Sequence, residues 1–227
     1  MIQQLDQSIT LALNGSDSLF WDNLMMCVTN TFSWSLIIIM LLVIFFRNNY
    51  VRDAFIILLT IGLMIFVADR LCSGLVKPMV ARWRPTQDPE IMYLIDIVDG
   101  YRGGRFGFFS GHACNTFCMA TFLSLLFRYK AVTFTLYFWS ATTTFTRLYL
   151  GVHYFGDVTV GLIVGCLIGW GFYYLYDKVM QRLQSSRLTS DQFTPTGYKK
   201  RDMNLFLAVV YFNYICVLLV SMIKGVG

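Results

Sequence analysis

Charged residues are scarce in this chain of 227 residues, where they make up 14% of the sequence. A soluble globular domain carries roughly 25%. Hydrophobic residues instead reach 56% and aromatic residues 17%. This balance excludes a disordered chain and argues against a water-soluble domain, and the many Tyr and Trp residues suit the two water interfaces of a bilayer. We therefore expect a polytopic membrane protein, whose first partner is the lipid bilayer.

The cysteines form none of the patterns that indicate metal or disulfide chemistry. The chain has six, most of them inside apolar runs, and no C-x-x-C pair occurs. They are expected to act as small apolar packing residues. The formal charge of +5 does not imply nucleic acid, because the placement of basic residues in a membrane protein matters more than their sum. No protein partner is indicated.

Six segments are apolar enough to be candidates for crossing a membrane, which takes about 20 residues per helix. The third is short and is expected to extend into flanking polar sequence. The fold class expected is therefore all-α, a bundle of about six transmembrane helices in a single domain over residues 1–227. The predicted spans are 25–46, 54–76, 113–127, 131–150, 156–176 and 205–223.

The first 24 residues predict a separate interfacial segment. Apolar residues recur there at helical spacing, at Ile2, Leu5, Ile9 and Leu13. This pattern is typical of an amphipathic helix that lies on the membrane surface. A cleavable signal peptide is not expected, because no Lys or Arg occurs before Arg47.

Basic residues are distributed unevenly among the connections. Ten of the 18 Lys and Arg residues fall in the first, third and fifth connections, which the positive-inside tendency assigns to the cytoplasm. Both termini and the second and fourth connections then lie outside. The fifth connection, residues 177–203, is interpreted as a flexible polar loop rather than a second domain.

The second connection departs from this pattern, because it is rich in positive charge on the face that should have little. These basic residues either balance nearby acids or form a site for an anionic group. The glycines between 100 and 107 form either a plain loop or a cover over a headgroup. The basic residues are Lys77, Arg82, Arg84, Arg102 and Arg105.

Asp69 and Arg70 lie within a predicted span, where ionisable groups are costly. Each needs a separate partner, and a structural and a functional role are equally open.

The chain has two histidines, and each stands beside other polar residues on the predicted outer face. Asp157 follows His153 by four positions, so on a helix its carboxylate can accept from one imidazole nitrogen and leave the other basic. Arg147 precedes His153 by six residues, and His112 follows Ser110-Gly111, where a small hydroxyl and a glycine allow a close backbone approach.

Such a set of groups suits phosphoryl transfer, in which cations hold the equatorial oxygens while a nucleophile and an acid stand in line. No acidic cluster with the spacing of magnesium ligands lies near the histidines. We therefore expect a reaction that needs neither a metal nor another cofactor.

Three stretches together resemble the signature of the type 2 phosphatidic acid phosphatase family. They are KPMVARWRP at residues 77–85, FSGH at 109–112 and TRLYLGVHYFGD at 146–157, and their order and internal spacings agree with the family pattern. Three motifs in order, with both histidines inside them, are much more specific than any one alone. Two positions depart from the pattern, with Phe109 in place of a proline and Thr146 in place of a serine. Phe109 removes a rigid turn former beside Ser110.

The resemblance implies a role for each matching residue. His153 would attack phosphorus, with Asp157 orienting it, and His112 would protonate the departing lipid oxygen. A nucleophilic base and an acid require opposite protonation states, which predicts a bell-shaped pH profile. The phosphoryl oxygens would be held by Lys77, Arg84, Ser110, Gly111 and Arg147.

The resemblance favours a lipid phosphatase at the outer face of a bacterial inner membrane. Undecaprenyl diphosphate, phosphatidylglycerophosphate and lipid A are equally compatible substrates. A phosphotransferase with an acceptor other than water is the alternative within the same fold. A transporter with an outer anion-binding vestibule is the alternative from another class. A vanadate-binding oxidase is disfavoured, because the oxidases of this family are soluble.

Overall fold

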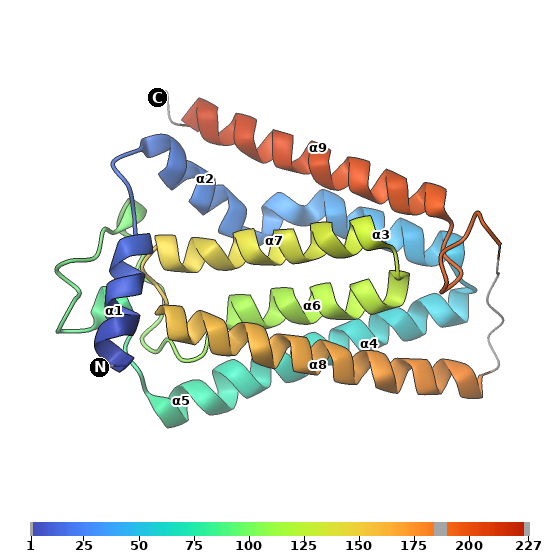
Figure 1. Cartoon of the computed structure of the whole chain (residues 1–227), viewed down its shortest axis with the longest axis horizontal. Coiled ribbons are helices and arrows are strands. Elements are labelled where there is room, and N and C mark those ends of the chain that lie inside the picture. The colour runs from blue at the N-terminus through green and yellow to red at the C-terminus, as the bar shows by residue number, and fades with distance from the viewer. Residues whose placement is uncertain (1, 184–189, 225–227) are drawn as a thin grey trace.

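Long helices run side by side along the longest axis of the molecule (Figure 1). The computed structural model describes residues 2–183 and 190–224. Within these ranges the ordered elements are helices, with two isolated β-bridges and no strand, so the predicted all-α membrane bundle is confirmed. The α-helices are α1 (Ile2–Leu13), α2 (Leu19–Thr29), α3 (Ser35–Asn48), α4 (Val51–Asp69), α5 (Lys77–Val80), α6 (Gly111–Phe127), α7 (Lys130–Tyr149), α8 (Phe155–Arg182) and α9 (Lys200–Lys224).

Four helical stretches have the length and apolar composition of membrane spans. The predicted third and fourth spans correspond to α6 and α7, which lie among these helices in the bundle (Figure 1). α6 has only 17 residues and begins at Gly111, so it extends little into the flanking polar sequence. α7 carries six Thr residues, of which Thr135, Thr143, Thr144 and Thr146 are buried within the protein. The four stretches are Thr31–Asn48, Val51–Val80, Phe155–Arg182 and Lys200–Lys224.

The first predicted span, 25–46, is wrong at its beginning. α2 ends at Thr29, and a 3-10 turn, Thr31–Trp34, separates it from α3. Asn30 causes the break: its backbone is extended, and its side chain accepts a hydrogen bond from the Phe32 amide. Asn favours such local capping over a continuous helix. Residues 25–29 therefore belong to α2.

Glycines on α8 bring this helix into close contact with α6. Gly161, Gly165 and Gly169 recur every four residues and face the backbone of α6. A methyl group added at Gly165 or Gly169 would collide with the carbonyl of Cys114 or Cys118, respectively. Small residues at this spacing let membrane helices approach closely. This glycine seam, formed by Gly161, Gly165 and Gly169, fixes α6 against α8. It thereby fixes His112, in the first turn of α6, relative to the turn before α8 that carries His153.

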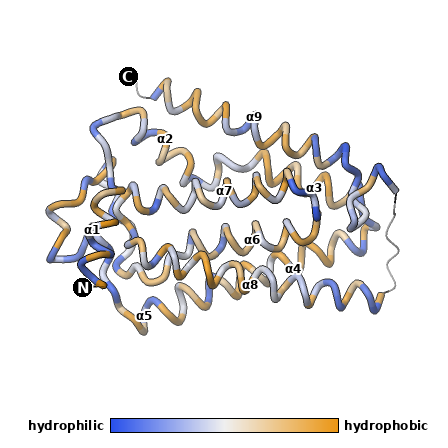
Figure 2. Tube along the Cα trace, viewed as in Figure 1, coloured by the Kyte–Doolittle hydropathy of each residue, from blue (hydrophilic) through white to orange (hydrophobic). Residues whose placement is uncertain are grey.

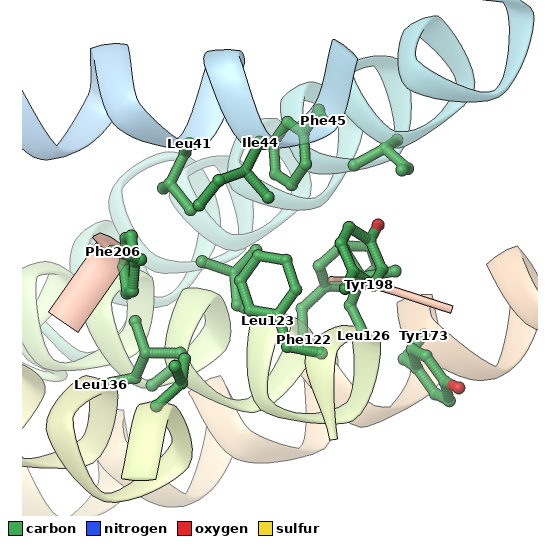
Figure 3. Close-up of a cluster of buried hydrophobic side chains, with 14 of the residues drawn as sticks. Leu41, Ile44, Phe45, Phe122, Leu123, Leu126, Leu136, Tyr173, Tyr198 and Phe206 are labelled. Atoms are coloured by element: carbon green, nitrogen blue, oxygen red, sulfur yellow. The ribbon is translucent and has the colours of Figure 1, made fainter. Parts of the chain in front are cut away.

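The largest hydrophobic core lies towards the end of the bundle away from the histidines. Side chains from α3, α6, α7, α8 and α9 meet there, among them Phe45, Phe122 and Phe206 (Figure 3). Polar and charged residues gather at the two ends of the bundle, while its middle is apolar (Figure 2). α1 and the last turn of α9 lie at the end opposite the α8–α9 connection (Figure 1).

The polar loop predicted over 177–203 is shorter than expected. α8 continues to Arg182 and α9 begins at Lys200. Residues 190–199 form a packed turn in which Tyr198 is buried with its ring 4.9 Å from that of Phe127. The Thr194 hydroxyl accepts from the Tyr198 amide and holds this turn. Residues 184–189 lie outside the described part of the chain.

The predicted amphipathic helix is α1, which crosses the end of the bundle (Figure 1). Ile2 and Leu5 are exposed, as expected for residues that face a membrane interface. Leu13, at the end of the helix, packs against a buried apolar cluster. The polar side of α1 also contacts the protein, where Asp6 bonds to Arg82 and to the first turn of α8. This contact was not predicted from the apolar spacing.

Candidate active site

The two histidines come together at the end of the bundle that α1 crosses. His112 lies in the first turn of α6, and His153 lies in the turn between α7 and α8. Arg147 closes α7, Lys77 begins α5, and Arg84 follows in the connection to α6. The structure thus brings the residues of all three sequence motifs to one place.

His153 is 1% exposed and lies between a carboxylate and a guanidinium. Its Nδ1 is 3.4 Å from Oδ2 of Asp157. Its Nε2 is 3.5 Å from Nη1 of Arg84. Burial lowers the pKa of His153 well below its usual value near 6.5, and the charges of the neighbouring cations lower it further. His153 is therefore neutral at pH 7 and can act as a nucleophile.

Asp157 is completely buried and engages three neighbours. Its Oδ1 accepts from Nη1 of Arg82 at 2.8 Å, and its Oδ2 accepts from the Tyr154 amide at 3.2 Å while facing His153. A buried carboxylate needs such partners, because desolvation of an unpaired charge is costly. Asp157 faces His153 as predicted, at 3.4 Å, but the geometry is not that of a hydrogen bond, and Arg82 makes the shorter contact.

Arg84 and Arg147, the two arginines expected to hold phosphate, are both buried and fixed by polar groups. Arg84 donates to the carbonyls of Phe106 and Val152, at 3.2 and 3.1 Å. Burial, and then the charge of Arg147, lower the pKa of Arg84 below its ordinary value. A guanidinium held in this way keeps its fork in a fixed direction for an anion.

Arg147 is held by two residues that the motifs do not contain. Its guanidinium donates to the hydroxyls of Thr29 and Tyr101, the latter at 2.9 Å. The Tyr101 ring also lies 5.5 Å from the guanidinium carbon. Thr29 closes α2 and Tyr101 lies in the loop before α6, so neither has a sequence spacing that points to Arg147.

Ser110 begins α6 as its N-cap and is completely buried. Its hydroxyl accepts from the Ala113 amide, and its own amide donates to the Asp157 carbonyl at 3.0 Å. The expected role of Ser110 and Gly111 in holding the phosphoryl oxygens stays a prediction. Gly111 faces the site, because a methyl group there would lie 4.0 Å from Nζ of Lys77.

Phe109, which stands where the family pattern has proline, is buried. Its carbonyl accepts from Sγ of Cys72 at 3.2 Å. Cys72 belongs to a π-helical turn, Arg70–Val76, that leads directly into Lys77. Such turns occur frequently at functional sites. The turn before His112 is thus tied to the segment that carries Lys77 without a proline.

Asp69 and Arg70 point away from this site. Both are exposed on the outer surface of the bundle. The Asp69 carboxylate accepts from Ser73, and Arg70 lies over the ring of Phe66 at 5.3 Å. As predicted, each has its own partner, and those partners are local.

The glycine-rich loop before α6 covers the buried end of the site. A methyl group at Gly103 would lie 2.6 Å from Nη1 of Arg84, and one at Gly107 would lie 2.8 Å from Oδ2 of Asp157. Only glycine leaves room at these two positions. Arg102 and Arg105 of the same loop instead contact the Thr86 carbonyl and the Trp83 ring.

His112 stands at the edge of a cavity of about 540 Å³ that extends between α3, α4, α6, α7 and α9. At the end of the cavity that contains His112 the lining includes the polar residues Thr29, Asn115 and Thr143. The deeper lining is apolar and includes Leu41, Ile65, Met119, Leu123 and Phe206. Such a cavity is within the size range of ligand pockets and can take an apolar chain.

The comparisons with known proteins agree with this geometry. The PAP2 superfamily matches residues 53–181, a stretch that contains all three motifs. The chain belongs to the PAP2 superfamily. This membership, together with the helical bundle, makes it a membrane phosphatase, as the resemblance implied. Among the residues that the structure describes, no group of three or more His, Cys, Asp or Glu could hold a metal ion.

Two PAP2 relatives are similar over most of their length. The chain is 40% identical to a protein named lipid A 4'-phosphatase from Bacteroides thetaiotaomicron, over 92% of this chain and 91% of that one. It is 32% identical to a protein of the same name from Porphyromonas gingivalis, over 77% and 74%.

A solved PAP2 structure shares the fold. It is a transmembrane phosphatidylglycerolphosphate phosphatase from Bacillus subtilis, with a TM-score of 0.55, 22% identity, and coverage of 80% of this chain and 87% of that one. At this identity the similarity concerns the fold alone.

Proposed function

We propose that this PAP2 protein removes a phosphate from lipid A, at its 4' position, at the outer face of a bacterial inner membrane. The names of its two relatives support this substrate. The observation that carries the proposal is the position of His112, between the buried cations around His153 and a deep cavity with an apolar floor. A phosphate can lie among the cations while an acyl chain enters the cavity.

The reaction proceeds in two steps. Nε2 of His153 attacks phosphorus, the bond between phosphorus and the lipid oxygen breaks, and His112 gives its proton to that oxygen. Water then attacks the phosphohistidine, its proton passes to His112, and the bond between phosphorus and nitrogen breaks. Asp157 stabilises the imidazolium that forms on His153. Lys77, Arg84 and Arg147 balance the charge on the phosphoryl oxygens.

Polar groups at the His112 end of the cavity suit the part of an acyl chain next to the sugar. Within the described chain, neither Oδ1 of Asn115 nor Oγ1 of Thr143 has a hydrogen-bond partner, and both residues line the cavity. Buried polar groups are usually paired. An amide of an acyl chain offers an N–H to Oδ1 of Asn115, and the carbonyl of an amide or an ester offers an acceptor to the hydroxyl of Thr143.

The test is phosphate release by purified protein in detergent with EDTA present, using lipid A, phosphatidylglycerophosphate, phosphatidic acid and undecaprenyl diphosphate. Mass spectrometry of the lipid A product identifies which phosphate is lost. We expect release from lipid A at the 4' position and none with His153→Asn. Release that needs an added acceptor would favour the phosphotransferase, and binding without cleavage would favour the transporter.

A further inference from the structure

Arg82 bridges two carboxylates from opposite ends of the sequence. Its Nη1 donates to Oδ1 of Asp157 on α8 at 2.8 Å, and its Nη2 donates to Oδ2 of Asp6 on α1 at 2.7 Å. The first motif places Lys77 and Arg84 at the phosphate, but it gives no role to Arg82. One guanidinium fork therefore connects α1 to the acid that faces His153.

Asp6 also fixes the turn that carries these residues. Its Oδ1 accepts from the Gly156 amide at 2.7 Å, and Oγ1 of Thr10 accepts from the Phe155 amide at 3.1 Å. The first amides of a helix have no partners within it and need acceptors from outside. α1 supplies two of them to α8, one turn or less from Asp157.

The Tyr154 ring holds the guanidinium in place from a third side. It lies 4.0 Å from the guanidinium carbon of Arg82, and its hydroxyl donates to Asp88 at 2.6 Å. Burial lowers the pKa of Arg82, but the charges of Asp157 and Asp6 raise this pKa by more than burial lowers it. The net change is therefore upwards, and Arg82 stays charged. A half-buried, stacked and doubly paired arginine has little freedom to turn towards a substrate.

We propose that Asp6 and Arg82 are positioning residues that hold the Asp157 carboxylate so that the proton of neutral His153 stays on Nδ1 and Nε2 is free to attack. With Oδ1 held by Arg82, Oδ2 is the oxygen that faces His153. Without Arg82 the carboxylate can rotate, and the imidazole loses the partner that selects its tautomer. This inference rests on the proposed reaction of His153.

Kinetics of single variants provide the first test. Arg82→Gln should lower kcat about 10- to 100-fold with KM changed less than about threefold. Losses of this size are typical when a residue that orients a metal-ligating side chain is removed, and Arg82 orients Asp157 in a comparable way. Asp6→Asn should lower kcat by less, because Arg82 remains. Arg82→Lys should keep part of the activity, because an ammonium can pair with Asp157 but cannot form the fork. Arg52→Gln is the matched control, since Arg52 pairs with Asp53 at the other end of the bundle.

Three kinetic outcomes would overturn the inference. The first is a wild-type kcat in folded Arg82→Gln. The second is a raised KM with unchanged kcat in that variant, which would mean that Arg82 binds substrate directly. The third is an equal loss of kcat in Arg52→Gln. If Arg82→Gln does not fold, Asp6→Asn and Arg82→Lys carry the same comparison.

The tautomer of His153 provides a second test that needs no substrate. In a His112→Gln protein with a histidine-free tag, His153 is the sole histidine, so ¹⁵N-histidine labelling reports it alone. We expect the proton on Nδ1 in this background and a mixture with Nε2-protonated imidazole after Arg82→Gln is added. An unchanged tautomer overturns the inference even where the wild type hydrolyses lipid A. A changed tautomer supports it even where no lipid is hydrolysed, in which case the proposed reaction alone fails.

Discussion

Gly165 on α8 lies directly against the backbone carbonyl of Cys114 on α6. The same seam begins at Gly161, which faces the carbonyl of Ser110, the residue two positions before His112. Because Asp157 lies in the first turn of α8, the distance between these helices sets the distance between the two halves of the active site. A backbone contact of this kind cannot relax by a change of rotamer.

Gly165→Ala should therefore weaken both stability and activity. Overpacking typically costs about 1–3 kcal/mol, and the separation of α6 from α8 should lower kcat/KM. Gly171→Ala on the same helix is the control, because a methyl group there has no neighbour within 4 Å; its free energy of unfolding in detergent should stay within about 0.5 kcal/mol of wild type. Equal behaviour of the two variants would show that the seam does not position the site.

Filling the cavity below His112 should separate lipid substrates from small ones. Met119 lines the cavity on α6, so Met119→Trp should raise KM for a long-chain lipid phosphate about tenfold or more, since about 1.4 kcal/mol of lost chain binding is a factor of ten. Hydrolysis of a short, water-soluble phosphate ester should change little. Leu59→Trp is the control, because Leu59 is 63% exposed on the outside of the bundle. A matching loss for the soluble ester would mean that the cavity does not hold the chain.

The sequence was sufficient to predict the bundle and the motif residues, because both depend on local patterns. Apolar runs of about 20 residues mark membrane helices, and His153 and Asp157 are only four positions apart, in the turn before α8 and in its first turn. α1 was also predicted from its period, although the polar face that meets the protein was not. Its partner Arg82 is 76 residues away in the chain, and a periodic pattern does not encode such a contact.

Other parts of the site depended on tertiary packing. Thr29 and Tyr101, which hold Arg147, belong to an ordinary helix end and an ordinary loop by sequence. The break at Asn30 was missed because apolar residues continue on both sides of it. The sequence does contain a signal for the contact between α6 and α8. Glycine occurs at every fourth residue from Gly161 to Gly169, a pattern that permits close packing of membrane helices.

The lowered pKa of His153 predicts how pH affects the protein. As pH falls through about 6.5, an unfolded histidine takes up a proton but buried His153 does not, so the free energy of unfolding should fall in acid. The acid limb of kcat/KM that belongs to His153 should lie below pH 6.5. Titration of ¹⁵N-labelled His153 in the His112→Gln background measures this pKa directly. A value at or above 6.5 would contradict the buried, cation-surrounded position of the side chain.

Removing the Tyr101 hydroxyl should loosen Arg147. Arg147 is 2% exposed, and its Nη2 donates to Tyr101 at 2.9 Å, so Tyr101→Phe leaves a buried charged donor without this acceptor. The expected cost is about 1–3 kcal/mol of stability, together with a higher KM, because the phosphate loses a fixed guanidinium. Tyr93→Phe is the matched control in the same connection, since Tyr93 is 84% exposed. Unfolding in detergent and steady-state kinetics measure both effects, and a Tyr101→Phe protein that matches Tyr93→Phe in stability and KM would show that Tyr101 does not hold Arg147 for substrate.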